Sequence, residues 1–267
     1  MKLISIKILF LLLIFFTHEL SAQVTDSSTI NEELLSLKYP SIKQPAVSKA
    51  TPFPAKSFII PGMMVTFGAL TLGSHELQEV NMEMKEEIWL ENPHKYQHID
   101  NYLQFAPAVA VYGLNAMGIH GKNNFRDRSM IYLMSNLILM SVVTPLKHLS
   151  HEMRPDGSDY YSFPSGHTAE AFASAEFLRQ EYKDASPWYG VAGYLVATST
   201  GVLRMYNNRH WLGDVVAGAG IGIASTRLSY WLYPKIQHLL FKDHPAHTMI
   251  MPTYQQGSFG FSMVHTY

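Results

Sequence analysis

The chain has 267 residues, 47% of them hydrophobic and 15% charged, so it can bury one sizeable core and is more apolar than an average soluble domain. Its formal net charge of -1 at pH 7 gives no overall attraction for nucleic acid. We therefore expect no nucleic-acid partner, and any anion site must be a local concentration of cations. The sequence contains no cysteine, which excludes disulfides and thiol chemistry.

The first 22 residues have the pattern of a secretory signal peptide. Lys2 and Lys7 flank the start of an apolar run at 8–16, and a small-residue site follows at 20–22. This pattern predicts an exported protein. The alternative is an uncleaved membrane anchor, although the run is shorter than the ~20 residues that a span needs. Residues 23–56 carry four prolines among Ser, Thr and Lys without apolar periodicity, which predicts a leader or linker at the surface.

From residue 57 onward the apolar residues recur at helical spacing, which predicts an all-α domain over 57–240, a bundle of about six core helices. The expected helices cover 58–73, 82–89, 105–119, 129–148, 167–182, 188–205 and 211–233. In the last of these, the glycine-rich stretch 218–222 follows no strand, so it predicts close helix packing and not a dinucleotide loop. The remaining residues, 241–267, are expected to form a C-terminal extension with a small β-hairpin of strands 248–254 and 260–267.

The helical segments give mixed signals about a membrane. Residues 129–146 form an apolar run about long enough to cross one. Residues 167–182, in contrast, include Glu170, Glu176 and Arg179, and a charged group costs ~2.5–3.5 kcal/mol at the centre of an inserted helix. The sequence predicts membrane association and leaves open whether the bundle spans the membrane or lies against it.

Two short blocks place charged residues and a glycine at predicted helix ends. Lys147 and Arg154 lie where a long apolar helix ends at a proline, and cations are favoured at a helix C-terminus. Ser165 and Gly166 stand directly before a predicted helix, whose unpaired N–H groups can bind an anion. His167 then lies in the first turn, beside that anion. Each block taken alone also fits an ordinary helix end.

A third block, at residues 204–214, contains Arg204, His210 and Asp214. If a helix begins at Trp211, His210 and Asp214 lie four residues apart on one face, so the carboxylate can accept a hydrogen bond from one ring nitrogen. The other ring nitrogen is then a free nucleophile, as in covalent catalysis. A helix-capping pair is the alternative interpretation of this spacing.

The order and spacing of the three blocks resemble those of the type 2 phosphatidic acid phosphatase (PAP2) and vanadium haloperoxidase superfamily. In this sequence the motifs are Lys-x6-Arg-Pro from Lys147, Pro-Ser-Gly-His ending at His167, and Arg-x5-His-x3-Asp from Arg204. The resemblance covers roughly residues 129–233 and departs from the family where Leu203 replaces the usual serine before Arg204. Because that serine is peripheral to the chemistry, the resemblance still implies the family's helical fold and activity.

The resemblance also implies a role for each motif residue. Three cationic side chains, a serine and a backbone N–H are expected to bind the phosphate oxygens: Lys147, Arg154, Arg204, Ser165 and Gly166. His210 is expected to attack phosphorus and Asp214 to orient His210. His167 is expected to protonate the leaving oxygen and then to activate water. No metal or cofactor is expected, since three fixed cations already meet the charge that phosphoryl transfer must stabilise.

Together these features predict an exported, metal-independent phosphatase with an extracytoplasmic, periplasmic site and a phosphohistidine intermediate. The predicted substrates are phosphomonoesters or diphosphates of lipids, such as a phosphorylated lipid or a polyprenyl diphosphate. Three alternatives stay open: a soluble periplasmic acid phosphatase acting on small phosphoesters, a vanadate-dependent haloperoxidase, and a non-catalytic envelope protein that binds phosphate. The sequence does not indicate an oligomeric state.

Overall fold

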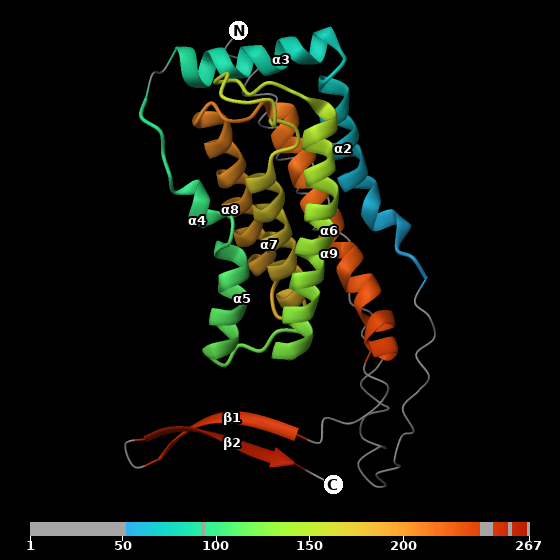
Figure 1. Cartoon of the computed structure of the whole chain (residues 1–267), viewed down its shortest axis with the longest axis vertical. Helices are drawn as coiled ribbons and strands as arrows, with labels where there is room; N and C mark the ends of the chain where they lie inside the picture. The colour runs from blue at the N-terminus through green and yellow to red at the C-terminus, as the bar shows by residue number, and fades with distance from the viewer. Residues whose placement is uncertain (1–51, 92–93, 241–247, 256–257, 266–267) are drawn as a thin grey trace.

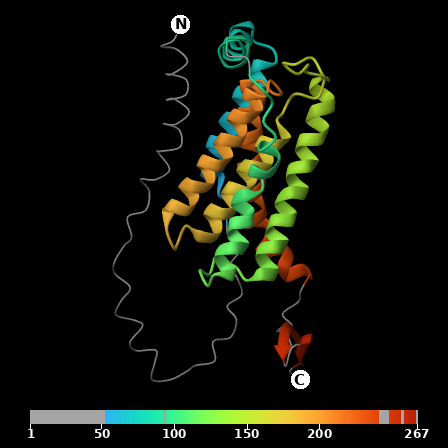
Figure 2. The same ribbon diagram turned by 90° about the vertical axis from the view of Figure 1, so that its left-hand side faces the viewer.

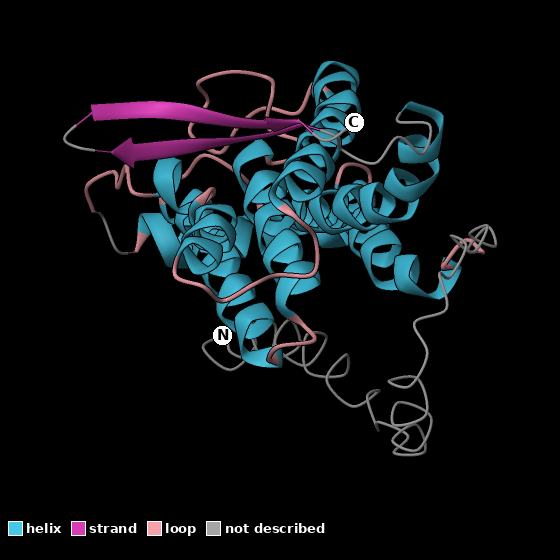
Figure 3. Cartoon of the chain, turned by 90° about the horizontal axis from the view of Figure 1, so that it is seen from below, coloured by secondary structure: helices cyan, strands magenta, loops and turns pink. Residues whose placement is uncertain are grey.

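The computed structural model describes residues 52–91, 94–240, 248–255 and 258–265. The predicted signal peptide and nearly all of the predicted leader lie outside the described residues. Over those residues the chain forms a helical bundle followed by a two-stranded hairpin (Figure 1). Seen from below, the helices of the bundle pack side by side with no sheet between them (Figure 3). The predicted all-α fold class is confirmed.

Each predicted helix has a counterpart in the described part of the chain, and one short helix, α4, is added. The helices are α2 (Ile59–Thr71), α3 (His75–Lys85), α4 (Asp100–Leu103), α5 (Ala106–Ala116), α6 (Phe125–Ser150), α7 (Gly166–Tyr182), α8 (Pro187–Tyr206) and α9 (Leu212–Leu240). A 3-10 turn, η3 (Ala55–Phe58), precedes α2, and a π-helical turn, η4 (Glu86–Leu90), follows α3. Helix α3 begins at residue 75 and not at 82. The prediction missed its first two turns because most of their residues are polar. The sequence does not predict α4, which has four residues.

The C-terminal hairpin is also present, with a first strand one residue longer than predicted and a second strand that begins two residues earlier. Strands β1 (Thr248–Gln255) and β2 (Ser258–His265) pair antiparallel, with Thr248 opposite His265 and Gln255 opposite Ser258. The two residues of the turn, 256–257, lie outside the described residues.

Helices α6, α7, α8 and α9 run alternately up and down the bundle, so the C-terminal ends of α6 and α8 meet the N-terminal ends of α7 and α9 (Figures 1 and 2). Helix α2 packs along α9. Helix α3 lies across the end of the bundle where the four termini meet (Figure 1), after a bend of 91° from α2. The three sequence blocks are thereby brought to one end of the molecule.

Helix α7 is the centre of the bundle and packs against α5, α8 and α9. Its contact with α9 is unusually close at two glycines. A Cβ added at Gly222 would lie 2.1 Å from the carbonyl oxygen of Ala169, and one added at Gly218 would lie 2.5 Å from the carbonyl oxygen of Ser165. Since no Cβ fits at either position, these glycines set the distance between the two helices. The close packing predicted for 218–222 is confirmed.

The charged residues of α7 are paired inside the bundle. Glu176 is completely buried and accepts from Arg179 Nη2 at 2.7 Å and from Arg227 Nε at 3.0 Å. Glu170 accepts from the Tyr132 hydroxyl at 2.5 Å. Pairing and hydrogen bonding of this kind make buried charge tolerable, so these charges do not oppose a membrane position for the bundle.

Apolar side chains are exposed on several sides of the bundle. Met63 of α2, Val109 of α5, Leu137 of α6 and Leu195 of α8 are 54%, 65%, 63% and 62% exposed. Within the described chain, α6 is long and apolar enough to cross a membrane, and α2 with α3 passes the same test only as a bent pair. Large apolar side chains are thus exposed on four helices of the bundle.

Candidate functional site

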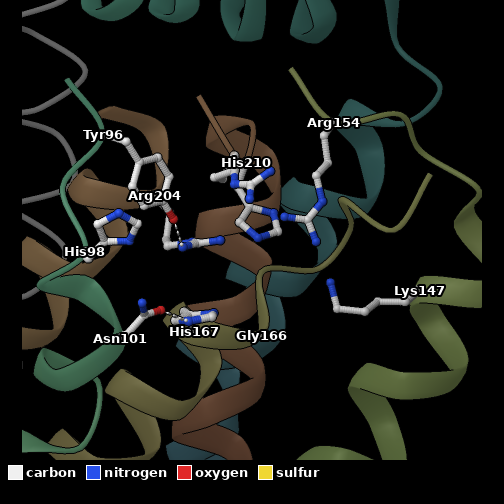
Figure 4. Close-up of a pocket in the computed structure, with 10 residues that line it drawn as sticks. Tyr96, His98, Asn101, Lys147, Arg154, Gly166, His167, Arg204 and His210 are labelled. Carbon is white, nitrogen blue, oxygen red and sulfur yellow. Dashed lines mark hydrogen bonds between the residues drawn. The ribbon is translucent and has the colours of Figure 1, made fainter. Parts of the chain in front are cut away.

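A pocket of about 620 Å³ opens at the end of the bundle where the helix termini meet (Figure 4). It is lined by Tyr96, His98, Asn101, Lys147, Arg154, Gly166, His167, Arg204, Arg209 and His210. Six of the eight residues predicted for the site are among them. The other two, Ser165 and Asp214, are completely buried and do not line the pocket.

Lys147 and Arg154 reach into the pocket from the same side (Figure 4). Lys147, near the end of α6, donates from Nζ to the carbonyl oxygen of Tyr161 at 2.7 Å. Arg154 follows α6 and donates from Nε to Asp159 Oδ1 at 2.8 Å. This bond uses Nε and leaves the two terminal nitrogens of the guanidinium directed at the pocket. Both cations are therefore held in place by the loop that joins α6 to α7.

Arg204 enters from the opposite side, at the end of α8 (Figure 4). Its Nη1 donates to Asp100 Oδ2 at 2.5 Å, and both side chains are buried. Its Nε is buried without a hydrogen-bond partner in the described structure. An unpaired buried donor costs about 1–3 kcal/mol.

His210 lies immediately before α9 and is 3% exposed. Its Nδ1 is 3.4 Å from Asp214 Oδ2, a distance at which the carboxylate orients the ring without a well-formed hydrogen bond. Asp214 Oδ2 also accepts from the Ser162 hydroxyl at 2.5 Å. Burial lowers the pKa of His210 to about 4, against the opposing effect of Asp214. The imidazole is therefore neutral at pH 7, with Nε2 left for the pocket.

Ser165 and Gly166 connect the second block to the third. The backbone N–H of Ser165 donates to the carbonyl oxygen of Asp214 at 3.1 Å. The Ser165 hydroxyl caps α7 by accepting from the N–H of Thr168 at 3.5 Å and contacts the Thr168 hydroxyl at 2.9 Å. In this structure the serine side chain is thus directed to the helix end, and its phosphate contact stays a prediction. Gly166 lines the pocket at the N-terminus of α7, where helix N–H groups favour an anion.

A carboxyl that the motifs do not indicate lies behind the pair of His210 and Asp214. Burial and the neighbouring Asp214 charge raise the pKa of Glu152 to about 9. Glu152 Oε2 and Asp214 Oδ1 are both buried, and neither has a partner among the described residues. A proton on Glu152 that is shared with Asp214 satisfies both oxygens at once. We therefore take Glu152 to be protonated at neutral pH.

Sequence reasoning missed one side of the pocket. Tyr96, His98 and Asn101 come from the segment that leads into α4, and Asn101 lies 46 residues before Lys147 in the chain. No pattern in a single sequence connects positions so far apart. Arg209 was also missed, although it stands directly beside His210, and its Nη1 is 2.8 Å from Asp156 Oδ2.

Helix α3 lies over the loops that carry the site. Lys85 Nζ donates to the carbonyl oxygen of Pro155 at 2.8 Å and lies 5.5 Å from the centre of the Trp211 ring. Asn81 Oδ1 accepts from the N–H of Gly213 at 3.1 Å, which satisfies one of the unpaired donors at the start of α9. The helix thus holds the first and third blocks together.

A helical bundle with cations gathered at the ends of four antiparallel helices is the architecture that the sequence motifs predict. Residues 128–238 match the model of the PAP2 superfamily, so this part of the chain is similar to that superfamily. It is similar to a lipid A 1-phosphatase of Porphyromonas gingivalis, with 38% identity over 161 residues, or 60% of this chain and 35% of that protein. It is also similar to a lipid A 4'-phosphatase of Bacteroides thetaiotaomicron, with 34% identity over 32% of this chain and 37% of that protein. The chain thus spans little more than a third of either relative.

Two solved structures resemble the chain. The crystal structure of Aquifex aeolicus LpxE is 23% identical, with a TM-score of 0.43 over 57% of this chain and 94% of that chain. That of a transmembrane PAP2 type phosphatidylglycerolphosphate phosphatase from Bacillus subtilis is 16% identical, with a TM-score of 0.44 over 69% and 99% of the two chains.

The pocket should bind phosphate or orthovanadate, and replacing Lys147, Arg154 or Arg204 by methionine should weaken binding about 10–100-fold in each case. Each change removes a charge-assisted hydrogen bond, worth ~1.5–3 kcal/mol. Isothermal titration calorimetry measures the effect. Lys122→Met, at an exposed position between α5 and α6, is the matched control. An equal loss in that control would show that general charge, and not the pocket, holds the anion.

The free energy of unfolding of Glu152→Gln should exceed that of the wild type by an amount that grows as the pH rises from 4.5 to 9. The difference should reach about 1–3 kcal/mol at the upper end. The folded-state pKa of Glu152 is raised, so the folded protein holds a proton that the unfolded chain releases above pH 4.5. Wild-type stability therefore falls through this range, whereas glutamine keeps a donor to Asp214 at every pH. Thermal unfolding of both proteins at several pH values tests this. A difference that does not change with pH would mean that Glu152 is ionised.

Proposed function

We propose that this protein is a metal-independent phosphatase of phosphorylated lipids that works through a phosphohistidine. The observation that carries the proposal is the convergence of three fixed cations on one pocket beside a neutral, buried histidine. Phosphoryl transfer needs positioning and stabilisation of charge on the equatorial oxygens more than any other assistance. Preorganised cations in a partly buried site supply both.

In the proposed reaction, Lys147, Arg154 and Arg204 bind the non-bridging oxygens, with Ser165 and the N–H of Gly166 completing the site. His210 Nε2 forms a bond to phosphorus as the bond from phosphorus to the leaving oxygen breaks, and His167 gives that oxygen a proton. Asp214 stabilises the charge that develops on His210. Water then attacks the phosphohistidine and gives a proton to His167, which releases phosphate and restores both histidines.

Phosphorylated lipids are the substrate class that the surface of the bundle supports best. Exposed apolar residues on α2, α5, α6 and α8 surround the bundle below the pocket, so an acyl or prenyl chain can stay in an apolar phase while its phosphate enters the cationic site. The similarity to lipid A phosphatases supports the same class. We propose that residues 57–240 form the catalytic domain, that residues 1–22 direct its export, and that the pocket is extracytoplasmic.

The purified protein should release phosphate from lipid substrates in the presence of a chelator, and His210→Ala should lower the rate at least about 10³-fold because it removes the nucleophile. Suitable substrates are lipid A, phosphatidic acid, a polyprenyl diphosphate and 4-nitrophenyl phosphate. Labelled phosphate on the protein should be acid-labile and base-stable. His120→Ala, between α5 and α6 and outside the pocket, serves as the control.

The substrate profile separates the proposed function from its alternatives. Preference for the aryl phosphate without detergent would support a soluble acid phosphatase. Peroxidase activity that appears only with vanadate would support a haloperoxidase. Phosphate binding without turnover would support a phosphate-binding envelope protein. Full activity in His210→Ala would mean that another group is the nucleophile.

Membrane topology can be tested with single cysteines, because the chain has none of its own. In spheroplasts, Ser158→Cys in the loop beside the pocket should react with a membrane-impermeant maleimide, whereas Lys122→Cys at the opposite end should react only after lysis. Labelling of both before lysis would show that the bundle lies outside without spanning the membrane. Labelling of Ser158→Cys only after lysis would place the site in the cytoplasm, contrary to the proposal.

A further inference from the structure

His167 contacts a residue that lies outside the part of the chain matched by the family model. Asn101, in the first turn of α4, places its side-chain oxygen 2.9 Å from His167 Nε2 (Figure 4). An amide oxygen only accepts hydrogen bonds, so it pairs with Nε2 when that ring nitrogen carries the proton. The two side chains lie on the side of the pocket opposite Lys147 and Arg154 (Figure 4). With its oxygen toward the ring, Asn101 therefore favours a proton on Nε2 of His167.

The position of Asn101 is fixed by its neighbours, although α4 is too short to be stable alone. Asp100 is completely buried and accepts from Arg204 Nη1 at 2.5 Å and from Asn207 Nδ2 at 3.2 Å. Asn207 also bonds both backbone groups of Gln97, each at 2.8 Å. The end of α8 therefore holds the backbone from which Asn101 reaches His167. The first turn of α4 thus positions both Arg204, through Asp100, and Asn101, the partner of His167.

An amide suits both halves of the proposed reaction. Burial and the charge of Arg204 lower the pKa of His167 to about 4, and the negative charge of a bound phosphate opposes this shift and favours the imidazolium. From the imidazolium, the proton moves from Nε2 to the leaving oxygen as the bond from phosphorus to that oxygen breaks. The bare Nε2 then needs a donor, which the amide provides by turning its Nδ2 toward the ring. When water attacks the phosphohistidine, Nε2 takes up the proton of the water and the oxygen of Asn101 accepts again.

We propose that Asn101 is the positioning residue of His167, which keeps the proton of His167 on Nε2 and the ring aligned for the leaving oxygen. The inference rests on the proposed function and extends it to the leaving-group side of the pocket. It assigns a role in proton transfer to a segment that carries none of the three motifs.

The test compares leaving groups. Asn101→Leu should lower kcat on a lipid or alkyl phosphate about 10–100-fold, within the range that positioned acid catalysis contributes. The same variant should change the rate at which 4-nitrophenyl phosphate forms the phosphohistidine, measured as a burst of nitrophenolate, less than about 3-fold, because nitrophenolate leaves without a proton. Asn101→Asp keeps an acceptor at Nε2 and should restore the alkyl rate in part. It should also extend activity to higher pH, because a carboxylate beside His167 favours the imidazolium. The other charged groups that act on His167 are unchanged in this variant; they are Arg204, Asp100, Arg154 and Lys147.

A matched control exists elsewhere in the chain. Asn115 contacts the ring of His120 at 3.3 Å, at the end of α5 away from the pocket, so Asn115→Leu removes a similar pair without touching the site. This variant should lose no activity on either substrate. Phosphate affinity and thermal stability of Asn101→Leu show whether the pocket is intact. A loss in the nitrophenolate burst rate as large as the loss on the alkyl phosphate, or no loss on the alkyl phosphate, would overturn the inference.

A second measurement does not depend on turnover. In protein labelled with ¹⁵N-histidine, the His167 resonances of the wild type should show the proton on Nε2, and Asn101→Leu should abolish that preference. A wild type that hydrolyses no substrate would contradict the proposed function, and the resonances would still decide the inference. An unchanged preference in Asn101→Leu would contradict it directly.

Discussion

The structure depends on keeping three cations close together in a pocket before any anion arrives. Two unit charges 4 Å apart interact by about 4 kcal/mol at the effective dielectric of a partly buried site, so an unsupported cluster would spread apart. Each cation is instead held by its own acceptor: a backbone carbonyl for Lys147, Asp159 for Arg154 and Asp100 for Arg204. The acceptors hold the cations in position and leave donors for a further anion. The pocket is thus organised in advance, which is the condition under which electrostatic stabilisation is strongest.

This organisation requires that the loops around the pocket be tied to the bundle. The N–H of Ser165 bonds the carbonyl oxygen of Asp214, and Gly218 lets α9 approach the same turn. Helix α3 adds a bond from Asn81 to the start of α9. The turn at Ser165 and Gly166 and the ring of His210 are therefore carried by helices whose separation is set by backbone contact.

Much of the fold and half of the pocket follow from the sequence, and the reasons are local. The helices have clear apolar periodicity, and the motif residues stand at helix ends that an antiparallel bundle brings together. Ser165 shows the limit of this reasoning, because a serine before a helix fits both a cap and a phosphate ligand, and only the fold selects between them. Glu152 occupies a spacer position between Lys147 and Arg154, where no pattern marks it. Asn101 meets His167 only through tertiary packing, which a single sequence does not encode in any local signal.

The two walls of the pocket come from separate stretches of the chain. The three cations and both histidines belong to residues 147–210, whereas Tyr96, His98 and Asn101 belong to a short segment ahead of α5. Under the proposed function, a change in that segment alters the wall of the pocket that faces the organic group and leaves the cations in place. Exchange of this short segment is therefore a direct route to a changed pocket wall beside an unchanged cationic cluster.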